Sequence, residues 1–207
     1  MEARPVFPIR LATAIIVGAL LLVMTPTAKA GLLTTGAASY CDPYSFQAFQ
    51  PWGDRSNYML MPGGSFEEST PAWKLSGGAK IISGNEPFYI RGKTDRRSLY
   101  MPAGSSATTP TMCFAAGDWH LRFVGVSPTR SSKLRVTVHV NSLLGLVSIL
   151  DGGTVSNDGT WRPSPQVGLL LTNVGGLLTT NAISIRFTAT SGTTQIDDAY
   201  LDPWKET

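Results

Sequence analysis

The dominant pattern in this chain is the alternation of apolar and polar residues with a period of two. Residues 133–140 (KLRVTVHV) alternate without interruption, residues 183–190 do the same, and residues 119–124 do so in their first half. Successive side chains of a β-strand point to opposite faces of a sheet. Each segment therefore predicts a strand with one buried face and one solvated face.

Further short apolar segments lie between turn sequences such as Asp151-Gly152-Gly153. They cover residues 58–61, 80–83, 98–101, 111–114, 146–150, 167–172 and 195–201. Short turns and a solvated face favour antiparallel pairing. About ten short strands without a convincing amphipathic helix predict an all-β fold, an antiparallel β-sandwich.

The first 30 residues have the pattern of a secretory signal peptide. Arg4 and Arg10 flank the start of an apolar run over residues 11–24, and Ala28-Lys29-Ala30 provides the small residues of a cleavage site. The run is shorter than the roughly 20 residues that span a bilayer, although an uncleaved anchor is the alternative. We expect cleavage after Ala30 and secretion of a mature extracellular chain without a membrane span.

Charge narrows the possible partners. The full chain has a formal net charge of +3, and loss of residues 1–30 removes three basic residues and one acidic residue, which leaves +1. The remainder contains no run of Lys and Arg of the kind that nucleic acids or anionic membranes require. We therefore expect no nucleic-acid partner.

The polar faces of the alternating strands nevertheless carry Arg122, Lys133, Arg135, His139 and Arg186. If these strands are neighbours, the cations form a basic stripe suited to acidic cell-wall polymers. The alternative is a mixed, solvated face that nearby carboxylates neutralise.

The strand pattern begins at residue 58, so we expect an N-terminal arm over residues 31–57 and a sandwich domain over residues 58–207. The arm is rich in aromatic residues, which indicates that it packs on the domain. The chain has two cysteines, Cys41 and Cys113. In an oxidising compartment they predict one disulfide bridge, which would tie the arm to the domain. Two free thiols are the alternative.

Two short motifs lie at opposite ends of the predicted domain. Gly64-Ser65-Phe66-Glu67 precedes Trp73, and Ile196-Asp197-Asp198-Ala199-Tyr200-Leu201 forms the last predicted strand. Together they resemble the opening and closing segments of jelly-roll carbohydrate-binding modules with the galactose-binding-like fold. In that family the segments read Gly-Phe-Glu and Ile-Asp-Asp-Val-x-Leu, so Ser65 and Ala199 are departures. The resemblance implies a jelly roll that binds glycan or cell-envelope polysaccharide.

The same resemblance implies a structural calcium ion between the first and last strands, at Glu67, Asp197 and Asp198. Carboxylate and carbonyl oxygens are the ligands that calcium prefers. The alternative is that the two aspartates accept hydrogen bonds from backbone N–H groups or arginine, with Glu67 solvated.

For the glycan itself, the most suitable loop covers residues 84–91 (GNEPFYIR). Phe88 and Tyr89 offer aromatic faces for sugar rings, and Asn85 and Arg91 offer hydrogen bonds to hydroxyl groups. The alternative is a loop whose Phe88 covers the edge of the sandwich.

Catalytic motifs are scarce. The sequence contains no nucleophile elbow, zinc-binding helix motif or phosphate-binding glycine loop, and its two histidines, His120 and His139, lie on predicted polar faces. We therefore expect a non-catalytic protein. Two readings remain open beside glycan binding: an extracellular structural or protein-interaction sandwich, and a small glycoside hydrolase built on two of the chain's carboxylates.

Overall fold

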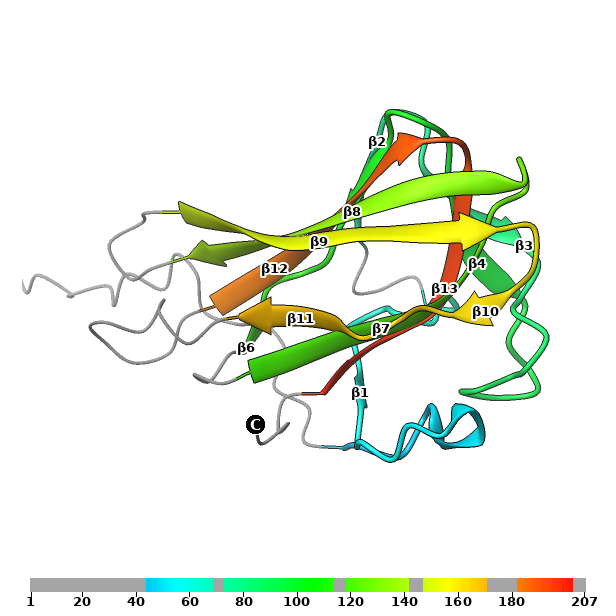
Figure 1. The fold of residues 1–207 in the computed structure, drawn as a ribbon, viewed down its shortest axis with the longest axis horizontal. Coiled ribbons are helices and arrows are strands. Elements are labelled where there is room, and N and C mark those ends of the chain that lie inside the picture. Colours follow the sequence, from blue (N-terminus) through cyan, green and yellow to red (C-terminus); the bar gives the residue numbers. More distant parts are fainter. Residues whose placement is uncertain (1–43, 69–72, 114–117, 142–146, 171–181, 203–207) are drawn as a thin grey trace, which may run out of the picture. The chain divides into compact units, whose positions relative to one another are not determined.

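The computed structural model describes residues 44–68, 73–113, 118–141, 147–170 and 182–202. These residues form two antiparallel sheets packed face to face (Figure 1). The predicted all-β antiparallel sandwich is therefore confirmed. The described elements are η1 (Gln50–Trp52), β1 (Met59–Leu60), β2 (Lys74–Ser76), β3 (Lys80–Ser83), β4 (Arg97–Met101), β5 (Ser106–Thr108), β6 (Met112–Cys113), β7 (Asp118–Val126), β8 (Ser131–Asn141), β9 (Val147–Asp158), β10 (Arg162–Pro163), β11 (Val167–Leu170), β12 (Ala182–Ser191) and β13 (Thr194–Asp202).

The first sheet has seven strands in the order β10-β7-β13-β4-β3, with β1 also paired to β13 and β11 to β7. The second has six strands in the order β2-β5-β12-β8-β9, with β6 also paired to β12. Inward-facing side chains of both sheets form one core, which includes Leu99, Leu121, Phe123, Val136, Ile185, Phe187 and Ile196. No helix of the described ranges is long and apolar enough to cross a membrane.

Strand β9 continues through the turn that the sequence predicts at Asp151-Gly152-Gly153. Val136 of β8 pairs with Gly153 and Thr137 pairs with Asp151, so Gly152 is the extra residue of a β-bulge. Gly153 has a φ of +96°, and its N–H donates a hydrogen bond of 3.0 Å to Asp151 Oδ1. The turn prediction is wrong because a glycine pair after aspartate supports a bulge as readily as a reversal.

The opening and closing motifs are hydrogen-bonded to each other. The Met61 N–H donates to the Ala199 carbonyl at 2.9 Å, and the Ala199 N–H donates to the Gly64 carbonyl at 3.0 Å. A Cβ on Gly64 would lie 2.6 Å from that Ala199 oxygen, so only glycine fits here. Trp73 closes the core beside them, with its indole N–H 2.8 Å from the Pro62 carbonyl. These contacts join the two ends of the sandwich.

Residues 44–57 lie against the outer face of the seven-stranded sheet. Phe49 of this arm is fully buried with Tyr58, Val124 and Tyr200 in a second hydrophobic cluster, and Phe46 pairs with Tyr58 across an antiparallel bridge. The predicted signal peptide and the rest of the predicted arm lie outside the described residues.

An ion pair fastens the arm to the sheet. Asp54 Oδ2 accepts hydrogen bonds from Arg122 Nη1 at 2.7 Å, the Tyr58 hydroxyl at 2.6 Å and Gln166 Nε2 at 3.0 Å. The guanidinium carbon of Arg122 lies 4.5 Å from the centre of the Phe49 ring. Burial alone would raise the pKa of Asp54, but these hydrogen bonds outweigh it and hold that pKa well below its usual range.

Candidate functional site

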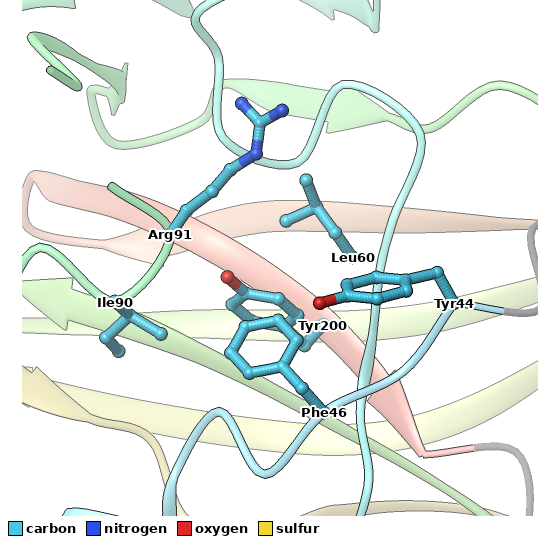
Figure 2. A pocket seen from close by; sticks show the side chains of 6 residues that line it. All are labelled: Tyr44, Phe46, Leu60, Ile90, Arg91 and Tyr200. Carbon is cyan, nitrogen blue, oxygen red and sulfur yellow. The ribbon is translucent and has the colours of Figure 1, made fainter. Parts of the chain in front are cut away.

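A pocket of about 370 Å³ opens between the arm, strand β1 and the outer face of β13 (Figure 2). It is lined by Tyr44, Phe46, Leu60, Ile90, Arg91 and Tyr200. The Phe46 ring meets Tyr200 edge to face at 5.6 Å between centroids, and Tyr44 meets Phe46 at 6.3 Å. Tyr44 is 72% exposed, so it forms an open aromatic wall. The pocket therefore combines aromatic surface with one cationic group.

Tyr200 places a polar atom in this pocket. Period-two alternation along β13 turns its side chain to the outer face, between the inward-facing Ala199 and Leu201, and its ring is fully buried. Its hydroxyl has no hydrogen-bond partner among the described residues. Burial raises the pKa of this hydroxyl further above its usual value, so it remains a donor at neutral pH. An unpaired buried hydroxyl costs about 1–3 kcal/mol, and a ligand oxygen would recover this energy once the side chains over the hydroxyl move to admit it.

Arg91 holds the rim of the pocket. Its Nη1 donates to Ser65 Oγ at 3.0 Å, and its Nη2 lies 3.3 Å from Glu68 Oε1. The side chains of Arg91 and Glu68 are 37% and 54% exposed, and an ion pair of that exposure contributes at most about 1 kcal/mol. The guanidinium can therefore exchange Glu68 for a ligand group at little cost.

Three buried carboxylates behind the pocket hold the loop of residues 84–91 on β13. Glu86 accepts hydrogen bonds from the backbone N–H groups of Phe88 and, at 2.8 Å, Ile90. Asp197 Oδ2 accepts the Glu86 N–H at 3.1 Å, and Asp198 Oδ2 accepts the Arg91 N–H at 3.2 Å. The closing motif thus positions the loop that carries Arg91.

Burial and the repulsion between neighbouring charges raise the pKa values of the two aspartates in this cluster. Burial, together with the charge of Asp198, raises the pKa of Asp197 to about 9. Burial, together with the charges of Glu86 and Asp95, raises the pKa of Asp198 to about 7. Asp198 Oδ1 is also buried without a hydrogen-bond partner. At neutral pH this cluster needs a proton or a cation.

The structure separates the three predicted calcium ligands. Asp197 and Asp198 lie together with Glu86, whereas Glu67 Oε1 accepts the backbone N–H groups of Arg96 at 2.6 Å and Arg97 at 2.5 Å. Within the described ranges, no three acidic, histidine or cysteine side chains are placed to share one metal ion. A calcium ion at the orphaned Asp198 oxygen would therefore depend on backbone carbonyls for its remaining ligands.

The structure places the four predicted ligand-binding residues at three separate positions. Arg91 lines the pocket of Figure 2. Asn85 and Tyr89 line a second pocket of about 420 Å³ beside residues 95–97. Phe88 is 41% exposed and packs edge to face on the Trp52 ring at 4.9 Å, so the arm partly covers it.

Sequence reasoning missed Tyr44, Phe46 and Tyr200 as lining residues. The aromatic content of the arm and the outward position of Tyr200 on the last strand were the available signals. Neither signal shows that the arm lies across β13.

The predicted disulfide bridge stays a prediction. Cys113 belongs to β6 and pairs with Ala182 of β12, while Cys41 lies outside the described residues.

No family model matches the chain, and no curated protein matches its sequence. Solved structures do share its fold. The CBM22-1 and GH10 modules of Clostridium thermocellum xylanase 10B, solved with xylohexaose, superpose with a TM-score of 0.52 at 12% identity, over 70% of this chain and 29% of that one.

Two isolated modules superpose less closely. The CBM22-1 xylan-binding domain of Paenibacillus barcinonensis Xyn10C has a TM-score of 0.48 at 14% identity, over 73% of this chain and 97% of that domain. TmCBM61, solved with β-1,4-galactotriose, has a TM-score of 0.40 at 18% identity, over 71% of this chain and 98% of that one. The chain has the jelly-roll, galactose-binding-like fold of carbohydrate-binding modules, and at these identities the likeness concerns the fold.

Proposed function

We propose that this chain is a secreted, non-catalytic domain that binds a glycan in the pocket between its arm and β13. The carrying observation is the buried, unpaired hydroxyl of Tyr200, a residue that lines an aromatic-walled pocket together with Arg91. Sugar rings pack on aromatic faces, while their hydroxyl groups need a few fixed hydrogen-bond partners. The xylanase chain of which 29% superposes on this fold was solved with xylohexaose, which supports polysaccharide as the ligand class.

The pocket also weighs against the two competing readings. A purely structural sandwich needs no concave aromatic cluster, and this chain has one. A glycoside hydrolase needs two carboxylates facing the scissile bond. The six lining residues include no carboxylate, and the second pocket contributes only Asp95.

The test uses the mature chain, residues 31–207, in affinity gels and calorimetry with xylan, β-1,4-galactan and related neutral polymers. Tyr200→Phe removes only the hydroxyl, so binding should weaken about 5- to 150-fold, the equivalent of about 1–3 kcal/mol. The same change should leave the melting temperature unchanged or raise it, because the unbound protein loses an unsatisfied polar atom. Tyr100→Phe, on β4, is the matched control.

Two results would overturn the proposal. One is the absence of retention on every polymer tested. The other is binding by Tyr200→Phe that equals the wild type.

We also propose that a structural calcium ion neutralises Asp197 and Asp198. Their raised pKa values and the orphaned Asp198 oxygen support this. The ion would rigidify the loop behind Arg91, and so support the pocket without contacting the glycan.

A further inference from the structure

The outer face of the six-stranded sheet is cationic. Period-two alternation turns Leu134, Val136, Ile185 and Phe187 into the core, so the residues between them face outward. Four exposed cations result, contributed by β2, β8 and β12: Lys74, Lys133, Arg135 and Arg186.

Strand register brings these cations together. Lys74 and Arg186 both pair with Thr108 of β5, and Arg186 pairs on its other side with Thr137, two residues from Arg135. Neighbouring strands lie about 4.8 Å apart and residues i and i+2 about 6.7 Å apart, so adjacent cations are separated by roughly 7–10 Å. That spacing is close to the Debye length of about 8 Å at physiological salt, so the cations act jointly on a ligand.

Carboxylates neutralise only part of this face. Asp151 of the edge strand β9 pairs with Arg135 at 3.1 Å, whereas Asp158 pairs at 3.2 Å with Arg162 of β10, which belongs to the other sheet. Among the described residues, the cations of this face that have no carboxylate partner are Lys74, Lys133 and Arg186.

A histidine also lies on this face. His139 faces the same side as Arg135 and pairs with Ser184, two residues from Arg186. Burial and the charge of Arg186 both lower the pKa of His139, so this histidine stays neutral at pH 7. The positive charge of the face therefore comes from its Lys and Arg residues.

We propose that this face is a second binding surface, for an acidic polysaccharide that carries carboxylate groups. The hydroxyl groups of Thr108 and Thr188 lie between the cations and would donate hydrogen bonds to sugar or carboxylate oxygens, while the Thr137 hydroxyl lies 3.4 Å from His139 Nε2. Charge complementarity of this kind gives salt-dependent attraction. Three cations without a carboxylate partner, one of which, Arg186, donates a hydrogen bond of 2.8 Å to Ser106 Oγ, are fewer than six to ten phosphate contacts on a duplex, so the face suits an acidic glycan better than a nucleic acid.

This surface is independent of the glycan pocket, because the two lie on the outer faces of different sheets. The cations of this surface come from three separate strands, so they do not form a run of Lys and Arg along the sequence.

The experiment measures retention of the mature chain in gels that contain polygalacturonate, with xylan and duplex DNA gels in parallel. Lys74→Glu/Lys133→Glu should raise the apparent dissociation constant for polygalacturonate about tenfold, and retention of the wild type should fall as salt rises. Lys80→Glu/Lys93→Glu is the charge-matched control, on β3 and on the segment between β3 and β4 of the other sheet. Tyr200→Phe should bind polygalacturonate like the wild type.

The proposal is overturned by any of three outcomes: no polygalacturonate retention, an equal loss in the Lys80→Glu/Lys93→Glu control, or stronger retention on DNA than on polygalacturonate. Each outcome leaves the Tyr200 test on neutral polymers standing, so the two proposals fail separately. Melting curves of the variants confirm that the fold is intact.

Discussion

Replacement of Asp54 by alanine should release the arm from the sheet. The side chains of Asp54 and Arg122 are only 10% and 11% exposed, and their charged atoms lie 2.7 Å apart. In Asp54→Ala the guanidinium keeps its buried position with the Ser164 carbonyl, 2.9 Å from Nε, and the Phe49 ring as its remaining partners. Loss of one member of a buried pair costs about 3–5 kcal/mol, because it leaves the other charge uncompensated.

The partner substitution should cost less. Arg122→Met keeps an apolar stem over Phe49, and Asp54 retains the hydrogen bonds from Tyr58 and Gln166. We expect a loss of about 2–3 kcal/mol for this variant. The double variant removes both charges, so its loss should fall below the sum of the single losses by about 2 kcal/mol. In a chain of this length, 4 kcal/mol lowers the melting temperature by roughly 10 °C.

The effect should depend on pH in one direction. Hydrogen bonds hold the pKa of Asp54 below its usual range, so the folded protein keeps this group ionised in mild acid. A carboxylate with a lowered pKa stabilises the fold fully above the unfolded value of about 3.9, and this contribution disappears as pH falls towards the folded value. The difference between wild type and Asp54→Ala should therefore be constant near neutrality and shrink below about pH 4.

Urea denaturation followed by tryptophan fluorescence measures these losses at pH 7 and pH 3. Arg135→Met is the matched control, because Arg135 and Asp151 form an ion pair whose side chains are 52% and 57% exposed. Such a pair contributes at most about 1 kcal/mol. Equal losses for Arg122→Met and Arg135→Met, or strict additivity in the double variant, would refute the stabilising role of the Asp54–Arg122 ion pair.

Three further predictions concern the calcium ion, the close backbone approach at Gly64 and the disulfide bridge. A chelator should lower the melting temperature of the wild type and have little effect on Asp198→Asn; identical melting curves with and without chelator would exclude the calcium ion. Gly64→Ala should destabilise the fold by more than about 1 kcal/mol, because its Cβ meets the Ala199 oxygen at 2.6 Å, and a wild-type denaturation midpoint would contradict that. Non-reducing mass spectrometry should find Cys41 linked to Cys113, and two alkylatable thiols would contradict the bridge.

The longest regular alternations predicted strands together with their faces, and the short apolar segments 58–61, 80–83 and 111–114 correctly predicted β1, β3 and β6. Some other short strands gave no signal, and only residues 146–150 of the twelve-residue β9 were predicted. Strands β8 and β12 have ten or eleven residues of alternating polarity, so their burial pattern is written in the sequence. Strands β2, β5 and β10 have two or three residues, too few to show a period. They form because a longer neighbour offers a ladder of hydrogen bonds, and that neighbour is distant in sequence.

The residues of the candidate site also fall into two groups, those with a local sequence pattern and those that only packing brings together. Arg91 was predicted from its loop, because an arginine near two aromatic residues is a local pattern. Tyr44 and Tyr200 are separated by more than 150 residues in the chain, and only the packing of the arm on β13 brings both to one pocket. Glu67 was grouped with Asp197 and Asp198 through the paired end motifs, and the motifs do meet, but through their backbones.

The sequence by itself determined the all-β class, the inward and outward faces of the long strands, and the residues that join the two ends. These properties depend on local periodicity and on residues such as Gly64 that tolerate a close backbone approach. Only the tertiary structure decided which outward faces are covered. It buried Arg122 beneath the arm and left Lys133 and Arg186 exposed on neighbouring strands, although all three occupy equivalent polar positions in the sequence. The reason is physical: strand order and register set the neighbours of each side chain, and both arise from contacts between segments that are far apart along the chain.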